Sequence, residues 1–284
     1  MFKKISTKQI FLLLTLVGLV AGIYYFWYKQ PSSRIIQVSS IAQVDRFLNA
    51  EVLSDPSIAN NTLVLFDLDN TLVEPTTELA SEHWFDACLK LYQTKGLSCC
   101  QAIKIVLPIY MKILHEVQMK TVEPDTVSVF NNLLSKVPTI AVTSRSLPLC
   151  DLTFRQLQSV GINFQQSMLV KHAFALDTCP IRFDHGILFC SGTDKGCAVT
   201  QFLKKLHLSP QLIILVDDKL KHVQAVAKAA AQQNISFVGL RYGFLDEKVK
   251  SFTLDQKSIA LLEQNAPGAR VKGFPREQRP CVAI

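Results

Sequence analysis

The sequence lacks the motifs that mark a zinc protein, a repeat protein or a nucleic-acid-binding protein. It contains 8 cysteines, but neither these nor His115, His172, His185 and His222 show a spacing typical of metal ligands. No internal repeat and no RNA- or DNA-binding motif is visible, and part of the net charge of +7 lies in the two ends of the chain. Basic tails favour a membrane surface over a nucleic-acid groove. We therefore exclude nucleic acid as a partner. The cysteine positions do not allow a disulfide pairing to be derived.

Charged residues are also missing from a stretch near the N-terminus. Ile10 to Tyr28 is an almost unbroken apolar run of 19 residues, which is long enough to span a bilayer. Tyr24, Tyr25 and Trp27 would contribute to an aromatic belt at its end. We predict an uncleaved transmembrane signal anchor, with a cleaved signal peptide or a buried helix of a soluble fold as the alternatives. In a bacterium, the slight excess of lysines before the run predicts that the rest of the chain lies in the periplasm, anchored to the membrane.

The most informative polar residues follow a short apolar run. Leu63 to Phe66 predicts a buried strand, and Asp67 and Asp69 come directly after it. Open α/β sheets bind ligands at the carboxyl ends of their strands, and residues two apart on a strand point the same way. Two close carboxylates repel each other unless a cation accompanies them. The pair indicates a magnesium site, although a solvated turn that caps a helix would have a similar sequence.

Three further segments follow in order along the chain. They are Ile140 to Arg145, an apolar run that ends in Thr143-Ser144-Arg145, then Asp194-Lys195-Gly196, and then Ile213 to Asp218, an apolar run that ends in two carboxylates. Together with Asp67 and Asp69, these segments resemble the four motifs of the haloacid dehalogenase (HAD) superfamily, from Thr62 to about Tyr242. Finer features resemble a poorly characterised HAD subgroup found mainly in intracellular bacteria.

Strands and helices alternate along the chain, which predicts a parallel sheet covered by helices on both faces. The resemblance implies an α/β, HAD-like (Rossmann-type) fold with a small helical cap inserted after the first strand. We expect Trp84 and Phe85 in the core of that cap. The predicted organisation is a signal anchor (residues 1–30), a linker and entry helix (31–61), a HAD core (62–74 and 121–265), the cap (75–120) and a disordered basic tail (266–284).

The resemblance also implies catalytic roles for four residues. Asp67 would be the nucleophile that forms an aspartyl-phosphate. Asp69 would protonate the leaving oxygen and then deprotonate the attacking water. Thr143 and Lys195 would stabilise the transferring phosphoryl group.

Two further sets of residues follow from the same resemblance. Substrate contacts are expected from Thr143, Ser144, Arg145 and Lys195, and a surface position for Arg145 is an equal alternative. The expected cofactor is Mg²⁺, with oxygen ligands from Asp67, Asp69 (through its backbone carbonyl), Asp217 and Asp218. His222 stands where many HAD enzymes carry an acidic or amide residue.

The expected function is a Mg²⁺-dependent phosphatase acting on phosphomonoesters. Its substrate class, a small molecule or a protein carrying phosphotyrosine or phosphoserine, stays open. A phosphotransferase or mutase is an alternative because the first half-reaction is shared, and a non-catalytic binding protein with the same fold is another. Asp69 argues against dehalogenation, which needs no such proton donor. P-type pumps are excluded because their Asp-Lys-Thr-Gly signature and multiple spans are absent.

The chain ends in Cys281-Val282-Ala283-Ile284, which matches the C-a-a-X pattern for prenylation. A chance match in a disordered tail is the alternative, and isoleucine is not a preferred final residue. Prenylation requires eukaryotic cytosol and so conflicts with a periplasmic anchor. The lipid interpretation therefore requires a protein that is secreted or delivered into a host cell.

Overall fold

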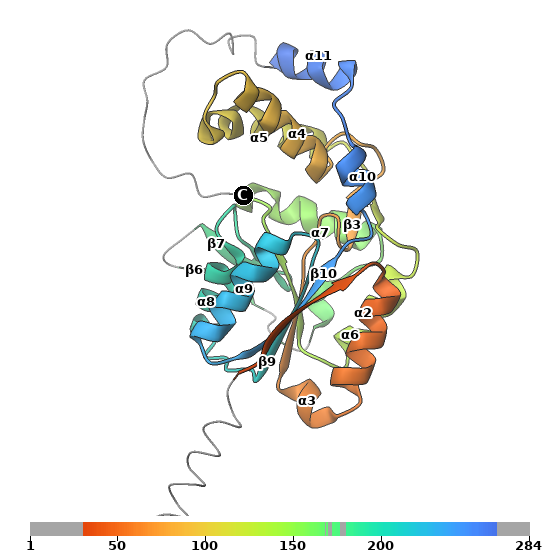
Figure 1. Cartoon of the computed structure of the whole chain (residues 1–284), viewed down its shortest axis with the longest axis vertical. Helices are drawn as coiled ribbons and strands as arrows, with labels where there is room; N and C mark the ends of the chain where they lie inside the picture. The colour runs from red at the N-terminus through yellow and green to blue at the C-terminus, as the bar shows by residue number, and fades with distance from the viewer. Residues whose placement is uncertain (1–30, 168, 170–171, 177–179, 266–284) are drawn as a thin grey trace, which may run out of the picture. The chain divides into compact units, whose positions relative to one another are not determined.

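The computed structural model describes residues 31–167, 169, 172–176 and 180–265, and an eight-stranded sheet forms their centre (Figure 1). The six strands from β1 to β8 in the spatial order run parallel, and the last two pair antiparallel. In spatial order the strands are β1 (Ser33–Val38), β10 (Ser236–Tyr242), β9 (Leu212–Asp217), β2 (Thr62–Phe66), β5 (Thr139–Thr143), β8 (Ile187–Phe189), β7 (Ile181–Asp184) and β6 (Phe174–Leu176). The predicted α/β fold with a mostly parallel sheet is confirmed.

Helices cover both faces of this sheet. Because side chains alternate along a strand, Leu63 and Leu65 of β2 pack against α8 and α9, whereas Val64 and Phe66 enter a second core with α2 and α6. Figure 1 shows these two pairs of helices on opposite sides of the central strands. The helices of the two layers are α2 (Ile41–Leu48), α3 (Pro56–Asn60), α6 (Thr126–Leu134), α7 (Cys150–Ser159), α8 (Lys195–Lys205) and α9 (Leu220–Gln232), with short helical turns at Asn49–Leu53, Leu147–Leu149 and Phe164–Gln166.

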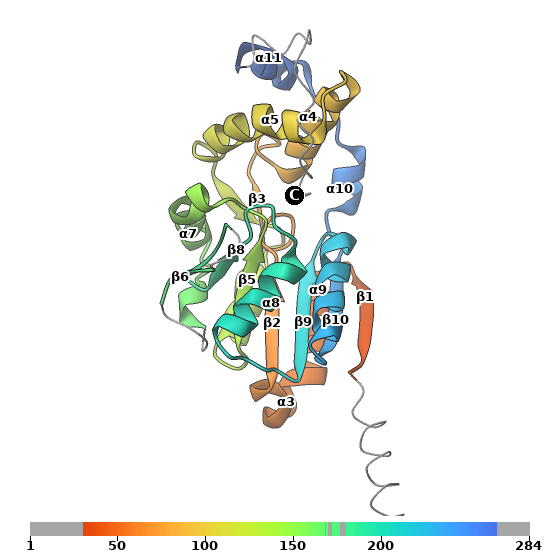
Figure 2. The same ribbon diagram turned by 90° about the vertical axis from the view of Figure 1, so that its left-hand side faces the viewer.

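A further helical layer lies beyond the carboxyl ends of the parallel strands (Figure 2). It contains α4 (Glu82–Thr94) and α5 (Cys99–Leu114), which lie between the paired strands β3 (Val73–Pro75) and β4 (Met119–Thr121). Two helices near the end of the chain, α10 (Asp246–Ser251) and α11 (Gln256–Asn265), extend from the core to α5. The residues predicted as a cap therefore meet a helix from the other end of the sequence.

The indole of Trp84 joins α4 to α11. Its Nε1–H donates to Ser258 Oγ over 2.9 Å, and both residues are buried. The ring of Phe85 packs on that of Tyr110 from α5, with centroids 4.9 Å apart. A buried indole N–H needs such a partner. Trp84 and Phe85 thus lie in the core of this helical layer, as expected.

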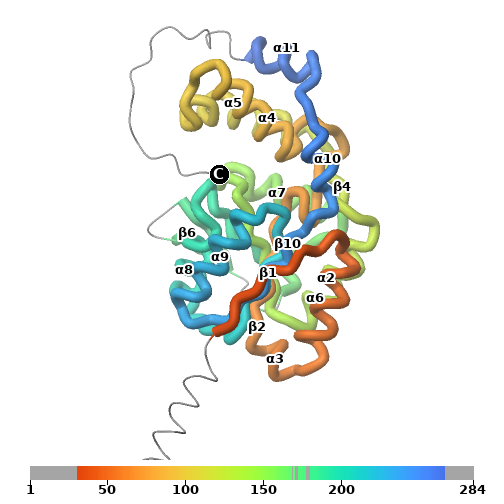
Figure 3. Tube along the Cα trace, viewed as in Figure 1, coloured from red at the N-terminus to blue at the C-terminus, as the bar shows by residue number. Residues whose placement is uncertain are grey.

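The segment 31–61, predicted as a linker with an entry helix, contains a sheet strand as well. β1 pairs with β10 in parallel from Ser33, opposite Phe237, to Val38, opposite Tyr242, and Figure 3 shows the two running side by side. Most of its side chains are exposed, so the segment has the composition of a polar linker although its backbone bonds to the sheet.

The fold-class prediction is wrong in one respect, which is its N-terminal transmembrane helix. None of the helices that the structure describes is both long and apolar enough to cross a bilayer. The supported fold is an α/β fold without a membrane-spanning helix among its described elements. The run from Ile10 to Tyr28, like Cys281 and the tail 266–284, lies outside the described residues.

Candidate active site

The carboxyl ends of three adjacent parallel strands bring the predicted motifs together. Asp67 directly follows β2, and its N–H donates to the carbonyl of Val216 in β9 over 2.9 Å. Asp217 ends β9 on one side of β2, and Thr143 ends β5 on the other. This edge is where open α/β sheets bind their ligands.

Lys195 connects two of these carboxylates. Its Nζ lies 2.6 Å from Asp67 Oδ1 and 2.7 Å from Asp217 Oδ2, and its side chain is only 1% exposed. Lys195 is the first residue of α8, where a cation opposes the helix dipole. The carboxylate of Asp194 offsets this by accepting a hydrogen bond from the N–H of Cys197 over 2.9 Å.

Gly196 allows the close packing of α8 on α9 that places Lys195 in the site. A Cβ atom on Gly196 would lie 2.3 Å from the carbonyl oxygen of Ala225 in α9, closer than any side chain allows. The absence of a side chain therefore lets the first turn of α8 pack directly on α9.

The shared ammonium leaves the carboxylates with an excess of negative charge. Burial raises the pKa of Asp67 above its ordinary value, against the opposing effect of Lys195. Burial would also raise the pKa of Asp217, but Lys195 and His222 outweigh it and hold that pKa at about 2. Burial opposes the charge on Lys195, but the two carboxylates outweigh it and raise its pKa, so the lysine stays charged.

Asp218 adds a third carboxylate with an unsatisfied oxygen. Its Oδ2 accepts a long bond of 3.4 Å from Asn70 Nδ2, while its Oδ1 is buried and has no hydrogen-bond partner among the described residues. Burial raises the pKa of Asp218 well above its ordinary value, and the charges of Glu82, Asp217 and Asp67 act in the same direction. Buried, unpaired carboxylate oxygens of this kind fit a divalent cation.

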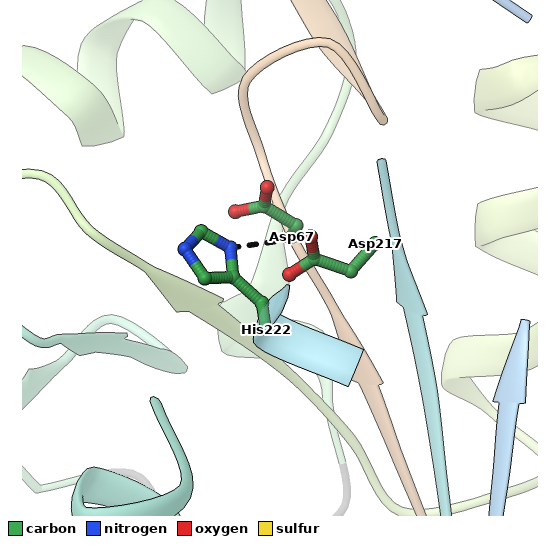
Figure 4. A group of neighbouring side chains, drawn as sticks. All are labelled: Asp67, Asp217 and His222. Atoms are coloured by element: carbon green, nitrogen blue, oxygen red, sulfur yellow. Dashed lines mark hydrogen bonds and ion pairs between the residues drawn. The ribbon is translucent and has the colours of Figure 1, made fainter. Parts of the chain in front are cut away.

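Asp67, Asp217 and His222 point toward one another (Figure 4). One possible ligand atom from each lies within 4.8 Å of the others. The Nδ1 of His222 lies 3.2 Å from Asp217 Oδ1, and burial lowers the pKa of this imidazole. Mg²⁺ prefers oxygen ligands, so we interpret His222 as a hydrogen-bond partner of Asp217 rather than as a ligand.

Asp69 pairs with Arg145. The guanidinium binds both carboxylate oxygens, with Nε 2.8 Å from Oδ2 and Nη2 2.7 Å from Oδ1. Arg145 is buried, contrary to a surface position, and its contact is with Asp69. The neighbouring hydroxyl of Thr143 accepts the N–H of Arg145 over 3.2 Å, and Ser144 is half-buried between the two.

Sequence reasoning missed Glu82 and Lys219. Lys219 follows Asp218, and its Nζ lies 2.5 Å from Glu82 Oε1 and 3.2 Å from Asp86 Oδ2, both on α4. Asn70 also donates to Glu82 over 3.2 Å. The first turns of α4 are therefore held by the same loops that carry the carboxylates. Only the position of Lys219 next to Asp217-Asp218 hinted at this role.

A cleft borders this edge of the site at Asp218 and Lys219. It has a volume of about 600 Å³, and its lining includes Asp86, Asp218, Lys219, Arg241 and Lys250. Asp218 lies on its wall, whereas Asp67, Lys195 and Asp217 are not among its lining residues. Both signs of charge line it, so charge alone does not select the ligand.

The sequence matches the model of a known protein family. The model of the family described as "Protein of unknown function (DUF2608)" matches residues 37–265. A relative from Chlamydia muridarum, named "Putative outer membrane protein", is 26% identical over 221 residues, which cover 76% of this chain and 79% of the relative.

Two solved structures are also similar to this chain. A haloacid dehalogenase-like hydrolase from Streptococcus pneumoniae has a TM-score of 0.40 and 16% identity, covering 63% of this chain and 93% of its own. The class C acid phosphatase from Bacillus anthracis has a TM-score of 0.38 and 15% identity, covering 82% and 87%. Since the family model spans most of the sequence, this chain belongs to the DUF2608 family.

Proposed function

We propose that the protein is a Mg²⁺-dependent phosphatase that hydrolyses phosphomonoesters through an aspartyl-phosphate on Asp67. One observation carries the proposal, namely the buried Lys195 between Asp67 and Asp217, with Nζ–O distances of 2.6 and 2.7 Å. Burying three charges is costly, and a packed apolar core would not need them. Their position at the carboxyl ends of adjacent strands supports a catalytic role.

The first half-reaction uses Asp67 and Asp69. An oxygen of Asp67 forms a bond to phosphorus as the bond from phosphorus to the leaving oxygen breaks. Asp69, protonated, gives its proton to that oxygen, and the alcohol departs. Lys195 lies against Asp67 and balances charge on the nucleophile and on the transferring oxygens. Thr143 and Ser144, at the end of β5, supply hydroxyl donors to the same group.

Water completes the cycle in the second half-reaction. Asp69 removes a proton from water, the resulting hydroxide bonds to phosphorus, and the bond to Asp67 breaks. Phosphate leaves and both aspartates return to their starting states. Asp67, Asp217, Asp218 and the carbonyl of Asp69 would hold Mg²⁺, which when bound neutralises phosphate charge and orients the phosphoryl group.

The site of action is proposed from the name of the chlamydial relative, which describes an outer membrane protein. We infer that this chain also acts at the cell envelope, outside the cytoplasm. A phosphoprotein or a small phosphoester from that compartment would be the substrate. Fractionation of cells that express the tagged chain tests this, and recovery in the cytoplasm would contradict it.

The activity test uses the full-length chain with p-nitrophenyl phosphate and phosphotyrosine, with and without Mg²⁺. We expect turnover that requires the metal and is lost in Asp67→Asn. The matched control is Asp151→Asn, an exposed aspartate on α7, which should keep full activity. A folded wild-type chain that binds Mg²⁺ but turns over no phosphoester would contradict the proposal.

A further inference from the structure

The guanidinium of Arg145 donates most of its hydrogen bonds to other residues of the protein. The side chain is 3% exposed, and its Nε and Nη2 both donate to the carboxylate of Asp69, over 2.8 and 2.7 Å. Its Nη1 donates to Thr153 Oγ1 over 3.1 Å and to Gln156 Oε1 over 2.8 Å, both on α7. A guanidinium has five N–H donors, and four of them are engaged here. Only one N–H donor of the guanidinium is then left to bind phosphate.

The contacts continue from Gln156 to the helical layer of α4 and α5. The side-chain Nε2 of Gln156 donates over 2.9 Å to the carbonyl of Leu114, the last residue of α5. Gln156 and Thr153 are buried. Buried polar groups that satisfy one another in this way hold a single arrangement. The chain of contacts from Asp69 through Arg145 and Gln156 thus ends on α5.

We propose that Arg145 is a positioning residue for Asp69, fixed in turn by Thr153, by Gln156 and through it by α5. The proposal rests on the proposed function, because it assigns Arg145 to the proton-transfer step of that reaction. The role differs from that of a phosphate clamp, which would bind the transferring group itself.

The geometry of the fork explains why an arginine is needed. Two parallel N–H···O bonds fix both the place and the plane of the Asp69 carboxylate. Each carboxylate oxygen keeps a second lone pair, which can carry the proton for the leaving group. A carboxylate with one bond would rotate, and proton transfer requires hydrogen-bond reach to the leaving oxygen. Lysine keeps the charge but has no fork.

Leaving groups of different basicity test the proposal. The leaving group of an alkyl phosphate is a strongly basic alkoxide, which needs the proton of Asp69. The leaving group of 2,4-dinitrophenyl phosphate is a phenolate that is stable as an anion. We would measure kcat/KM, which reports steps up to departure of the leaving group, for full-length wild type, Arg145→Lys and Arg145→Gln. General acid catalysis contributes roughly 10²- to 10⁴-fold. We therefore expect losses of more than about 10-fold with the alkyl ester and less than about 3-fold with the dinitrophenyl ester.

Two reference variants give the scale of the effect. Asp69→Asn should show the same selective loss, in larger measure, since it removes the proton donor. Arg155→Gln, an exposed arginine on the same helix as Gln156, should leave both rates unchanged. If neither Arg145 variant folds, Gln156→Met carries the test, because it removes an acceptor of Nη1 and the link to Leu114. A selective loss with the alkyl ester is again the expected result.

Three results would overturn the inference. Equal losses with both esters, together with a raised KM, would mean that Arg145 binds phosphate. Full activity of Arg145→Lys would mean that charge without the fork is sufficient. Unchanged activity in Arg145→Gln would mean that Asp69 needs no such support. Failure of the proposed function looks different, because wild type itself would then show no turnover that depends on Asp67, and both proposals would fall.

Discussion

Replacing Lys195 by methionine tests the electrostatic centre of the site. Methionine has a similar length and no charge, so the substitution leaves Asp67 and Asp217 buried against each other without their ammonium. Both carboxylates are at most 7% exposed at the side chain. Water cannot take over the role of the lysine, and the folded state should lose stability.

The size of the loss can be estimated from the two contacts. At 2.6 and 2.7 Å, each pair has a Coulomb energy on the order of 6 kcal/mol at an effective dielectric constant of about 20. Desolvation of the charges offsets most of this. Removing one partner of a buried ion pair costs about 3–5 kcal/mol. For a domain of this size that corresponds to a lower Tm by about 6–20 °C.

Thermal unfolding of the full-length chain in the presence of a chelator measures this effect. Lys204→Met is the control, since Lys204 is exposed on the same helix and its loss should shift Tm by no more than about 2 °C. Mg²⁺ should narrow the gap between Lys195→Met and wild type, because a bound cation restores positive charge beside the carboxylates. A Lys195→Met protein that unfolds at the wild-type temperature without metal would refute this account of the site.

Three other substitutions have defined outcomes. Gly196→Ala puts a methyl group 2.3 Å from the carbonyl oxygen of Ala225 and should separate α8 from α9. The folded state should lose about 1–3 kcal/mol of stability, and kcat/KM should fall. Unchanged stability together with unchanged kcat/KM would contradict the packing argument. Asp218→Asn should weaken Mg²⁺ binding in calorimetry and yet raise Tm without metal, since it removes a carboxylate that burial and its neighbours disfavour; unaltered Mg²⁺ affinity would argue against this ligand. Lys219→Met should speed amide hydrogen exchange in the first turns of α4, because the contact with Glu82 is lost; wild-type exchange rates there would show that the contact does not hold the helix.

The central strands could be predicted because their sequences have one interpretation. β2, β5 and β9 are mostly buried and apolar. β5 and β9 end at the predicted site residues Thr143 and Asp217, and β2 ends one residue before Asp67. β1 could not be recognised in this way. It is an edge strand with mostly exposed side chains, so its sequence resembles that of a polar linker, and only its pairing with β10 defines it.

The partners of the site residues could not be predicted, because they are distant in sequence. Arg145 and Asp69 are 76 positions apart, and Lys219 and Glu82 are 137 apart. The strand order brings the first pair together, and the packing of α4 brings the second. Neither pair can be inferred from the short-range spacing of residues. For Arg145, that spacing left a phosphate clamp and a surface residue as equal alternatives.

The packing of α11 on the residues predicted as a cap has the same cause. The contact between Trp84 and Ser258 spans 174 positions. Periodicity within residues 75–120 predicts helices there, but gives no sign that a helix from the other end of the chain completes their core. The division of the chain into core and cap therefore stays a prediction, while the helices themselves are described.

The most direct test of the central claim is to identify the residue that becomes phosphorylated. The full-length chain would be incubated with a phosphoester and Mg²⁺, quenched, and treated with borohydride, which reduces an aspartyl-phosphate to homoserine. Mass spectrometry of the peptides then locates the modified residue. The account predicts homoserine at position 67, and none in Asp67→Asn. Turnover without any homoserine, or homoserine at another aspartate, would contradict it.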